Sequence, residues 1–284
     1  MTAVTVPASP RVEAMAARRL WAQRGTLLVL LYSAILMLFL IVPLLVVLWR
    51  TASSGQLGPY LANDVVVSAL RLSILTTTIA LTSSVVFGTP LAYLLARGRF
   101  PGRGVIDTLV DLPMVLPPAV AGVALLLTFG RRGLLGGWLG ALGIEVGFTT
   151  AAVVLAEVFV AAPFYVRAAK TGFEGVDREL EYVSGSLGAS SLRTFLRVTV
   201  PLAMPALLGG AVMTWARALG EFGATIMFAG NFPGTTQTMP LAIYVAMERD
   251  LPAALVLASI LIVASFVVLL GFKTLARARV SAVP

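Results

Sequence analysis

The sequence of 284 residues contains no cysteine and no histidine, and only 12% of its residues are charged. Without cysteine the chain can form neither disulfides nor thiolate metal sites, and without histidine it lacks the commonest general base. A soluble domain of this length has roughly twice this share of charged residues. These absences exclude cysteine- and histidine-dependent enzymes and argue against a water-soluble fold.

Apolar residues make up 58% of the chain, and the mean hydropathy is +0.95. Several apolar runs exceed about 18 residues, the length that crosses a bilayer as a helix. The first is too long for a signal-peptide core and has no small-residue cleavage site behind it. We therefore predict an all-α polytopic membrane protein with six transmembrane helices at about residues 26–49, 72–96, 105–129, 148–169, 201–228 and 251–270.

The basic residues indicate the orientation of these spans. Fifteen Lys and Arg residues fall on the side of the N-terminus and five on the other side, and cytoplasmic loops are the basic ones. We expect cytoplasmic tails at residues 1–25 and 273–284, a membrane domain at 26–272, and a cytoplasmic loop at 171–200. In a membrane protein the placement of Lys and Arg reports first how the chain is oriented in the lipid bilayer. The net charge of +8 therefore does not indicate nucleic-acid binding, and we predict none. Arg131 and Arg132 are an exception to the rule.

The loop at 171–200 is polar and has helix signals. Asp177 is a plausible N-cap, and Glu179 and Glu181 follow it at the positive end of a short helix. Gly188 fits the left-handed position that ends such a helix, and Ser190 can cap the next one. A helix, a glycine turn and an amphipathic helix that enters the membrane at Pro201 are predicted. The alternative is a solvated loop between spans.

The spacing of Glu181, Gly188 and Val200-Pro201 resembles the signature loop of bacterial ABC importer permeases, although Tyr182 replaces the small residue that usually follows the glutamate. The resemblance implies a type I ABC importer permease fold. It also implies a coupling helix that docks into a groove of a cytoplasmic ATPase subunit. The residues to which it assigns this coupling are Glu179, Glu181, Tyr182, Ser186, Leu187, Gly188, Ala189 and Ser190.

Four further stretches resemble the molybdate branch of these permeases, which is close to the sulfate permeases. They are residues 88–97, 111–118, 217–225 and 238–244. The resemblance implies that the chain passes molybdate, or tungstate, from an extracytoplasmic oxyanion-binding protein and pairs with a second permease copy as a homodimer.

No phosphate-binding loop of the Gly-x-x-x-x-Gly-Lys-Ser/Thr type occurs. Lys170-Thr171 is the nearest candidate, but Phe164 and Ala169 stand where glycines are needed. We therefore expect no cofactor in this chain, with ATP and Mg²⁺ bound by separate ATPase subunits. With no nucleophile and base pair either, the chain is not expected to be an enzyme.

Arg217 and Glu221 are spaced i, i+4, which places them on one face of a helix where they can pair. Counted from Pro201, Arg217 lies about 24 Å along that helix, in the outer half of the membrane. One hypothesis is an outer gate of the translocation path, formed by Arg217, Gly220, Glu221, Phe222 and Gly223, with the glycines allowing close approach between subunits. The alternative is a structural ion pair.

Asp111 and Glu157 are two further acidic residues inside predicted spans. Each is expected to be a hydrogen-bonded group of the bundle interior, with a place on the translocation path as the alternative.

Three other functions stay open. The nearest is a sulfate or thiosulfate ABC permease subunit. A gradient-driven secondary transporter is disfavoured because the sequence has no inverted repeat and few intramembrane carboxylates. A passive assembly factor is disfavoured by the polar coupling-like loop.

Overall fold

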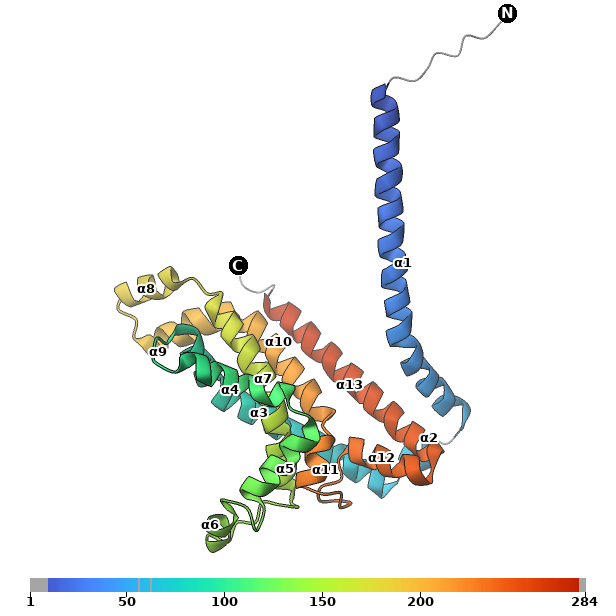
Figure 1. Ribbon diagram of the computed structural model, residues 1–284, viewed down its shortest axis with the longest axis vertical. Coiled ribbons are helices and arrows are strands. Elements are labelled where there is room, and N and C mark those ends of the chain that lie inside the picture. The colour runs from blue at the N-terminus through green and yellow to red at the C-terminus, as the bar shows by residue number, and fades with distance from the viewer. Residues whose placement is uncertain (1–9, 56, 62, 281–284) are drawn as a thin grey trace, which may run out of the picture. The chain divides into compact units, whose positions relative to one another are not determined.

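The structure is a computed structural model that describes residues 10–55, 57–61 and 63–280, and all regular structure in these ranges is helical (Figure 1). The predicted tails lie partly outside these ranges, at residues 1–9 and 281–284. The helices in chain order are α1 (Pro10–Ser53), α2 (Leu57–Leu61), α3 (Asp64–Arg97), α4 (Arg103–Val115), α5 (Pro118–Phe129), α6 (Gly136–Ala141), α7 (Thr150–Glu174), α8 (Arg178–Ser186), α9 (Ser191–Thr194), the π-helix η1 (Phe195–Thr199), α10 (Val200–Leu219), α11 (Gly223–Phe228), α12 (Met239–Arg249) and α13 (Leu251–Val280).

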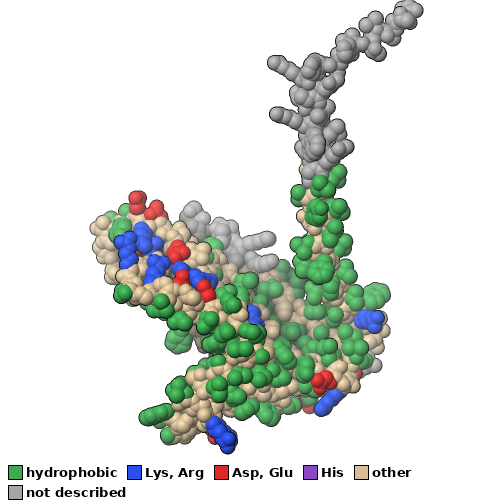
Figure 2. All heavy atoms as spheres, viewed as in Figure 1, with side chains coloured by type: hydrophobic (Ala, Val, Ile, Leu, Met, Phe, Trp, Pro, Cys, Tyr) green, Lys and Arg blue, Asp and Glu red, His purple; other side chains and the backbone are tan. Residues whose placement is uncertain are grey.

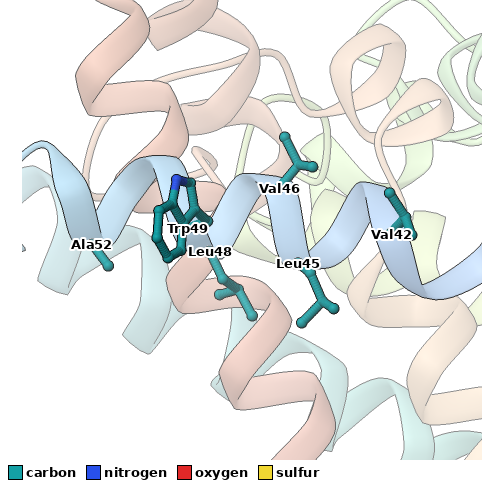
Figure 3. A pocket seen from close by; sticks show the side chains of 6 residues that line it. All are labelled: Val42, Leu45, Val46, Leu48, Trp49 and Ala52. Atoms are coloured by element: carbon teal, nitrogen blue, oxygen red, sulfur yellow. The ribbon is translucent and has the colours of Figure 1, made fainter.

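The helix α1 forms a unit of its own, and a second unit begins at Ser54. From Leu27 to Trp49 its large apolar side chains are largely exposed, as expected for a helix whose neighbours are lipids or other helices. A shallow apolar hollow runs along its last part (Figure 3), and the side chains that line it belong to Val42, Leu45, Val46, Leu48, Trp49 and Ala52.

Among the residues that the structure describes, five helices are long and apolar enough to cross a membrane. A sixth span results if α4 and α5, which meet at a bend of 115°, count as one broken span. Counted in this way, the described residues contain six candidate spans, which is the predicted number. The five continuous ones are Thr26–Ser53, Asp64–Arg97, Thr150–Glu174, Ser191–Leu219 and Leu251–Phe272.

The bend between α4 and α5 follows from two consecutive prolines. Pro117 and Pro118 have no backbone N–H to donate, and a proline disfavours helical backbone at the residue before it. Leu116 is accordingly extended, with ψ of 137°, and Pro118 begins α5 as its first residue. The third predicted span is thus two short helices with different directions.

The core of the second unit lies where α3, α7 and α10 pack together. Small residues let these helices approach closely, which is how membrane helices commonly gain packing contacts. A Cβ atom at Gly210 of α10 would lie 2.6 Å from Ala168 Cβ of α7, and one at Gly172 would lie 2.6 Å from Ala206 Cβ. Substitution of either glycine would therefore push α7 and α10 apart.

Two features after residue 190 differ from the predicted pattern. The chain is helical without interruption from Ser191 to Leu219, because a π-turn at 195–199 leads into Pro201. An unpredicted helix, α12, follows the loop at 230–237.

Tyr60 of α2 contacts the residue that follows α12. It donates a hydrogen bond of 2.5 Å to Asp250, and this bond raises the pKa of Tyr60.

Candidate functional site

The segment from residue 177 to 194 has the local structure predicted for it. Asp177 caps α8 by accepting a hydrogen bond of 2.9 Å from the Glu179 N–H. Gly188 has φ of 82°, the left-handed conformation that a glycine adopts without strain. Ser190 caps α9, accepting from the Arg193 N–H at 3.4 Å. A short helix, a glycine turn and a second helix are confirmed.

Glu181 faces the bundle and connects α8 with η1 and α3. Its Oε1 accepts a hydrogen bond of 2.7 Å from the Thr199 hydroxyl of η1 and lies 3.2 Å from the Arg97 guanidinium of α3. Arg97 also donates to the Val176 carbonyl at 2.7 Å. The Glu181 and Arg97 side chains are only 18% and 12% exposed. Glu181 is therefore an internal anchor of α8.

Three aromatic rings lie between the last turn of α3, the end of α7 and η1. Tyr93 makes edge-on contacts with Phe173 and Phe195, with ring centroids 5.6 and 4.9 Å apart. Phe173 is fully buried. A hydroxyl pair of 2.9 Å between Ser184 and Thr194 joins α8 to α9. The rings therefore hold α3, α7 and η1 together, and α8 is attached to this group through Glu181 and Ser184.

Of the other coupling candidates, Glu179, Tyr182 and Ser186 lie on α8, and residues 187–190 form the turn that follows it. Tyr182 is 71% exposed and Leu187 is 83% exposed, and Val183 between them is also exposed. Ala189 is half-buried, whereas Glu179, Ser186, Gly188 and Ser190 are exposed. α8 stands at one end of the second unit (Figure 1), where Lys, Arg, Asp and Glu side chains gather (Figure 2). Exposed apolar side chains therefore lie among charged ones at this end.

The Arg217–Glu221 pair exists, but not on a single helix as the spacing suggested. α10 ends at Leu219, and α11 begins at Gly223 after a break. Arg217 lies 2.7 Å from Glu221 Oε2, while Glu221 Oε1 accepts a hydrogen bond of 2.7 Å from the Ala224 N–H. Glu221 thus joins the end of α10 to the first turn of α11, and its side chain is 1% exposed.

The glycines of this break differ in their surroundings. A Cβ at Gly223 would lie 2.8 Å from Pro118 Cβ, so the close approach that this glycine permits is with α5 of the same chain. Close approach between subunits at these glycines stays a prediction. Gly220 is exposed and has no such neighbour. Phe222 packs against Tyr244 of α12, with ring centroids 5.2 Å apart.

The two other intramembrane acids have partners that the sequence did not indicate. Asp111 of α4 pairs with Arg167 of α7. Glu157 is 2% exposed and accepts a hydrogen bond of 2.8 Å from the Thr76 hydroxyl of α3. Both are hydrogen-bonded groups between helices, as predicted, although Asp111 is about one-third exposed.

This fold is found in solved structures of bacterial ABC transporters. The chain superposes on a bacterial ABC transporter structure, described as involved in the import of the acidic polysaccharide alginate, with a TM-score of 0.72 at 17% identity. The match covers 92% of this chain and 99% of that one.

The sequence defines the family more closely. Residues 88–281 match the family described as binding-protein-dependent transport system inner membrane component, and the chain belongs to this family. It is therefore a multi-pass inner membrane protein and a permease subunit of an ABC importer.

Two relatives are informative about the branch. The molybdenum transport system permease protein ModB of Mycobacterium tuberculosis is 44% identical over 206 residues, which are 72% of this chain and 77% of the relative. The sulfate transport system permease protein CysT of Escherichia coli is 37% identical over 241 residues, which are 84% of this chain and 87% of the relative. The chain is thus similar both to a molybdenum permease and to a sulfate permease.

Proposed function

We propose that this chain is the permease subunit of an ATP-driven molybdate importer, with tungstate as the chemically equivalent cargo. Two copies form a homodimeric path through the bilayer. An extracytoplasmic oxyanion-binding protein delivers the substrate, and two ATPase subunits, which bind ATP and Mg²⁺, attach at the cytoplasmic end. Both termini are cytoplasmic. The chain itself performs no catalysis.

The observation that carries this proposal is that the α8 segment has both an exposed apolar surface and an internal attachment to the bundle. A helix that receives force from an ATPase needs an exposed surface for the partner and a rigid attachment to the bundle. Tyr182 and Leu187 supply the surface, since large exposed apolar side chains mark interaction sites. Glu181 supplies the attachment through Arg97 and Thr199. The ATPase subunits therefore dock on the outer face of α8.

The orientation follows from charge. The end of the second unit that carries α8 also carries Arg97, Arg103, Lys170 and Arg178, and cytoplasmic segments are enriched in such residues. Figure 2 shows the charged side chains gathered there. With α8 in the cytoplasm, the helix breaks at Leu116 and Gly220 lie toward the outer side of the membrane.

The choice of molybdate rests on the higher identity with the molybdenum permease, 44% against 37% for the sulfate permease. Sulfate is the second candidate, because the sulfate permease aligns over the larger share of this chain, 84% against 72%. Both oxyanions are tetrahedral dianions, so a path that only gates them need not distinguish between them. Selection then falls to the binding protein.

The test is ATP hydrolysis by the reconstituted complex in proteoliposomes, with binding proteins loaded with molybdate, tungstate or sulfate. We expect stimulation by the molybdate-loaded protein, together with uptake of molybdate. Stimulation by the sulfate-loaded protein alone would assign the chain to the sulfate branch. Failure of the ATPase subunits to associate with the purified chain would refute the proposed arrangement altogether.

A further inference from the structure

The helix α4 is attached to the bundle in an unusual way. None of its residues is buried, and large apolar side chains such as Val105, Leu109 and Val115 are exposed. Its main packing partner is α7. Val110 packs against the core around α7, and the remaining attachment of α4 is through polar contacts between the two helices.

These contacts form a continuous series of ion pairs. Lys170 Nζ lies 2.8 Å from both carboxylate oxygens of Asp107, and Arg167 bonds Asp107 Oδ1 at 3.1 Å. Arg167 also pairs with Asp111. Glu174 lies 3.9 Å from Lys170 and 3.4 Å from Arg103. We name this series the α4–α7 ion ladder, and its members are Arg103, Asp107, Asp111, Arg167, Lys170 and Glu174.

The ladder stands between the two functional regions described above. At one end, Glu174 is the last residue of α7 and is followed within three residues by Asp177, the cap of α8. At the other end, α4 stops at the proline bend, beyond which α5 packs on α11 where Pro118 meets Gly223. Within residues 63–280, the ion pairs between α4 and α7 therefore lie between α8 and the bend at Leu116.

We propose that the α4–α7 ion ladder is the positioning element that makes α4 follow α7 and α8, so that displacement of α8 reaches the bend at Leu116. The inference rests on the proposed function of α8. Lys170 is its central member, since its side chain is only 11% exposed and bonds both oxygens of Asp107. The Arg103–Glu174 pair is more exposed and contributes little.

The first test replaces the central cation. Lys170→Met keeps the length and apolar stem of the side chain but removes its charge. In proteoliposomes that contain the whole complex, we expect substrate transported per ATP hydrolysed to fall about tenfold, while stimulated ATP hydrolysis changes by less than about twofold. Lys170→Arg, which retains the charge, should restore the ratio.

The matched control is Arg131→Gln, which removes a 2.7 Å ion pair with Glu145 far from α4. It should leave the transport ratio unchanged. If Lys170→Met lowers transport and hydrolysis in parallel, or lowers neither, the ladder does not have the proposed role.

The second test measures the position of α4 directly. Because the chain has no cysteine, spin labels can be placed at Val115→Cys and Thr171→Cys, both exposed positions. In complexes with one labelled permease copy, we expect one narrow distance distribution, and a broad one in Lys170→Met. An unchanged distribution would overturn the proposal. This readout needs no transport, so it separates failure of the ladder from failure of the proposed function.

Discussion

Substitution of Glu181 by glutamine tests whether this residue is an internal anchor or a contact for the ATPase. Glutamine keeps a carbonyl oxygen that can accept the Thr199 hydroxyl, but it removes the charge that faces Arg97 at 3.2 Å. The two side chains are 18% and 12% exposed, so water screens their interaction poorly. Arg97 then keeps its hydrogen bond to the Val176 carbonyl but faces a neutral amide in place of the carboxylate.

The expected cost follows from these partners. Hydrogen bonds to charged groups contribute about 1.5–3 kcal/mol. Removal of one member of a fully buried pair costs about 3–5 kcal/mol. Since Arg97 retains one partner and both groups reach some solvent, we expect Glu181→Gln to cost about 2 kcal/mol. Glu181→Ala also loses the Thr199 bond, and should cost about 1 kcal/mol more.

The assay is thermal unfolding of the purified permease, with recovery of the ATPase subunit on the immobilised permease as a second readout. Leu187→Ala provides the contrast, because a side chain that is 83% exposed should change stability by less than about 0.5 kcal/mol. We expect Leu187→Ala to lose ATPase binding at full stability. Leu134→Ala, at an exposed position in the loop after α5, is the control for removal of a surface leucine.

Two outcomes would refute this reasoning. If Glu181→Gln unfolds at the wild-type temperature yet loses ATPase binding, then Glu181 contacts the ATPase and is not an anchor. If Leu187→Ala binds the ATPase as well as the wild type does, the outer face of α8 is not the docking surface.

Other substitutions test the outer break. Gly223→Ala should cost about 1–3 kcal/mol by overpacking, because its Cβ would lie 2.8 Å from Pro118 Cβ. Gly220→Ala should unfold near the wild-type temperature, because the atom nearest to its Cβ would be 3.7 Å away. Equal unfolding temperatures for the two variants would contradict the close packing of α5 and α11. Joint replacement of Arg217 and Glu221 by Met and Gln should abolish transport if the pair belongs to a gate, and unchanged transport in the reconstituted complex would leave it a purely structural ion pair.

Sequence reasoning succeeded where the cause of a structure is local. Asp177, Gly188 and Ser190 have the capping and turn roles predicted from residue type and spacing, because a cap depends on a few neighbouring backbone groups. The membrane helices follow from the length of apolar runs. In the same way, the close spacing of Arg217 and Glu221 was enough to predict their pairing, although not the break between them.

What sequence reasoning missed depends on residues far apart in the chain. Glu181 meets Arg97 across 84 positions, and Arg167 meets Asp111 across 56, and no periodicity in the sequence records such pairings. The third span was predicted as one helix at about residues 105–129, and the bend of 115° between α4 and α5 was not predicted. The direction of α5 depends on its packing against α11, which begins more than a hundred residues after the bend.

The π-turn before Pro201 has a mechanical consequence. It absorbs the missing backbone donor of the proline without ending the helix, so that Ser191–Leu219 is one continuous element of 29 residues. The Thr199 bond to Glu181 therefore attaches α8 directly to the helix that ends at Gly220. A movement of α8 would act on the outer break at Gly220 through α10, and on the bend at Leu116 through the α4–α7 ion ladder. Since α5 and α11 are packed together at Pro118 and Gly223, the two routes end on one rigid pair of helices. Loss of either route should therefore impair opening without impairing assembly of that pair.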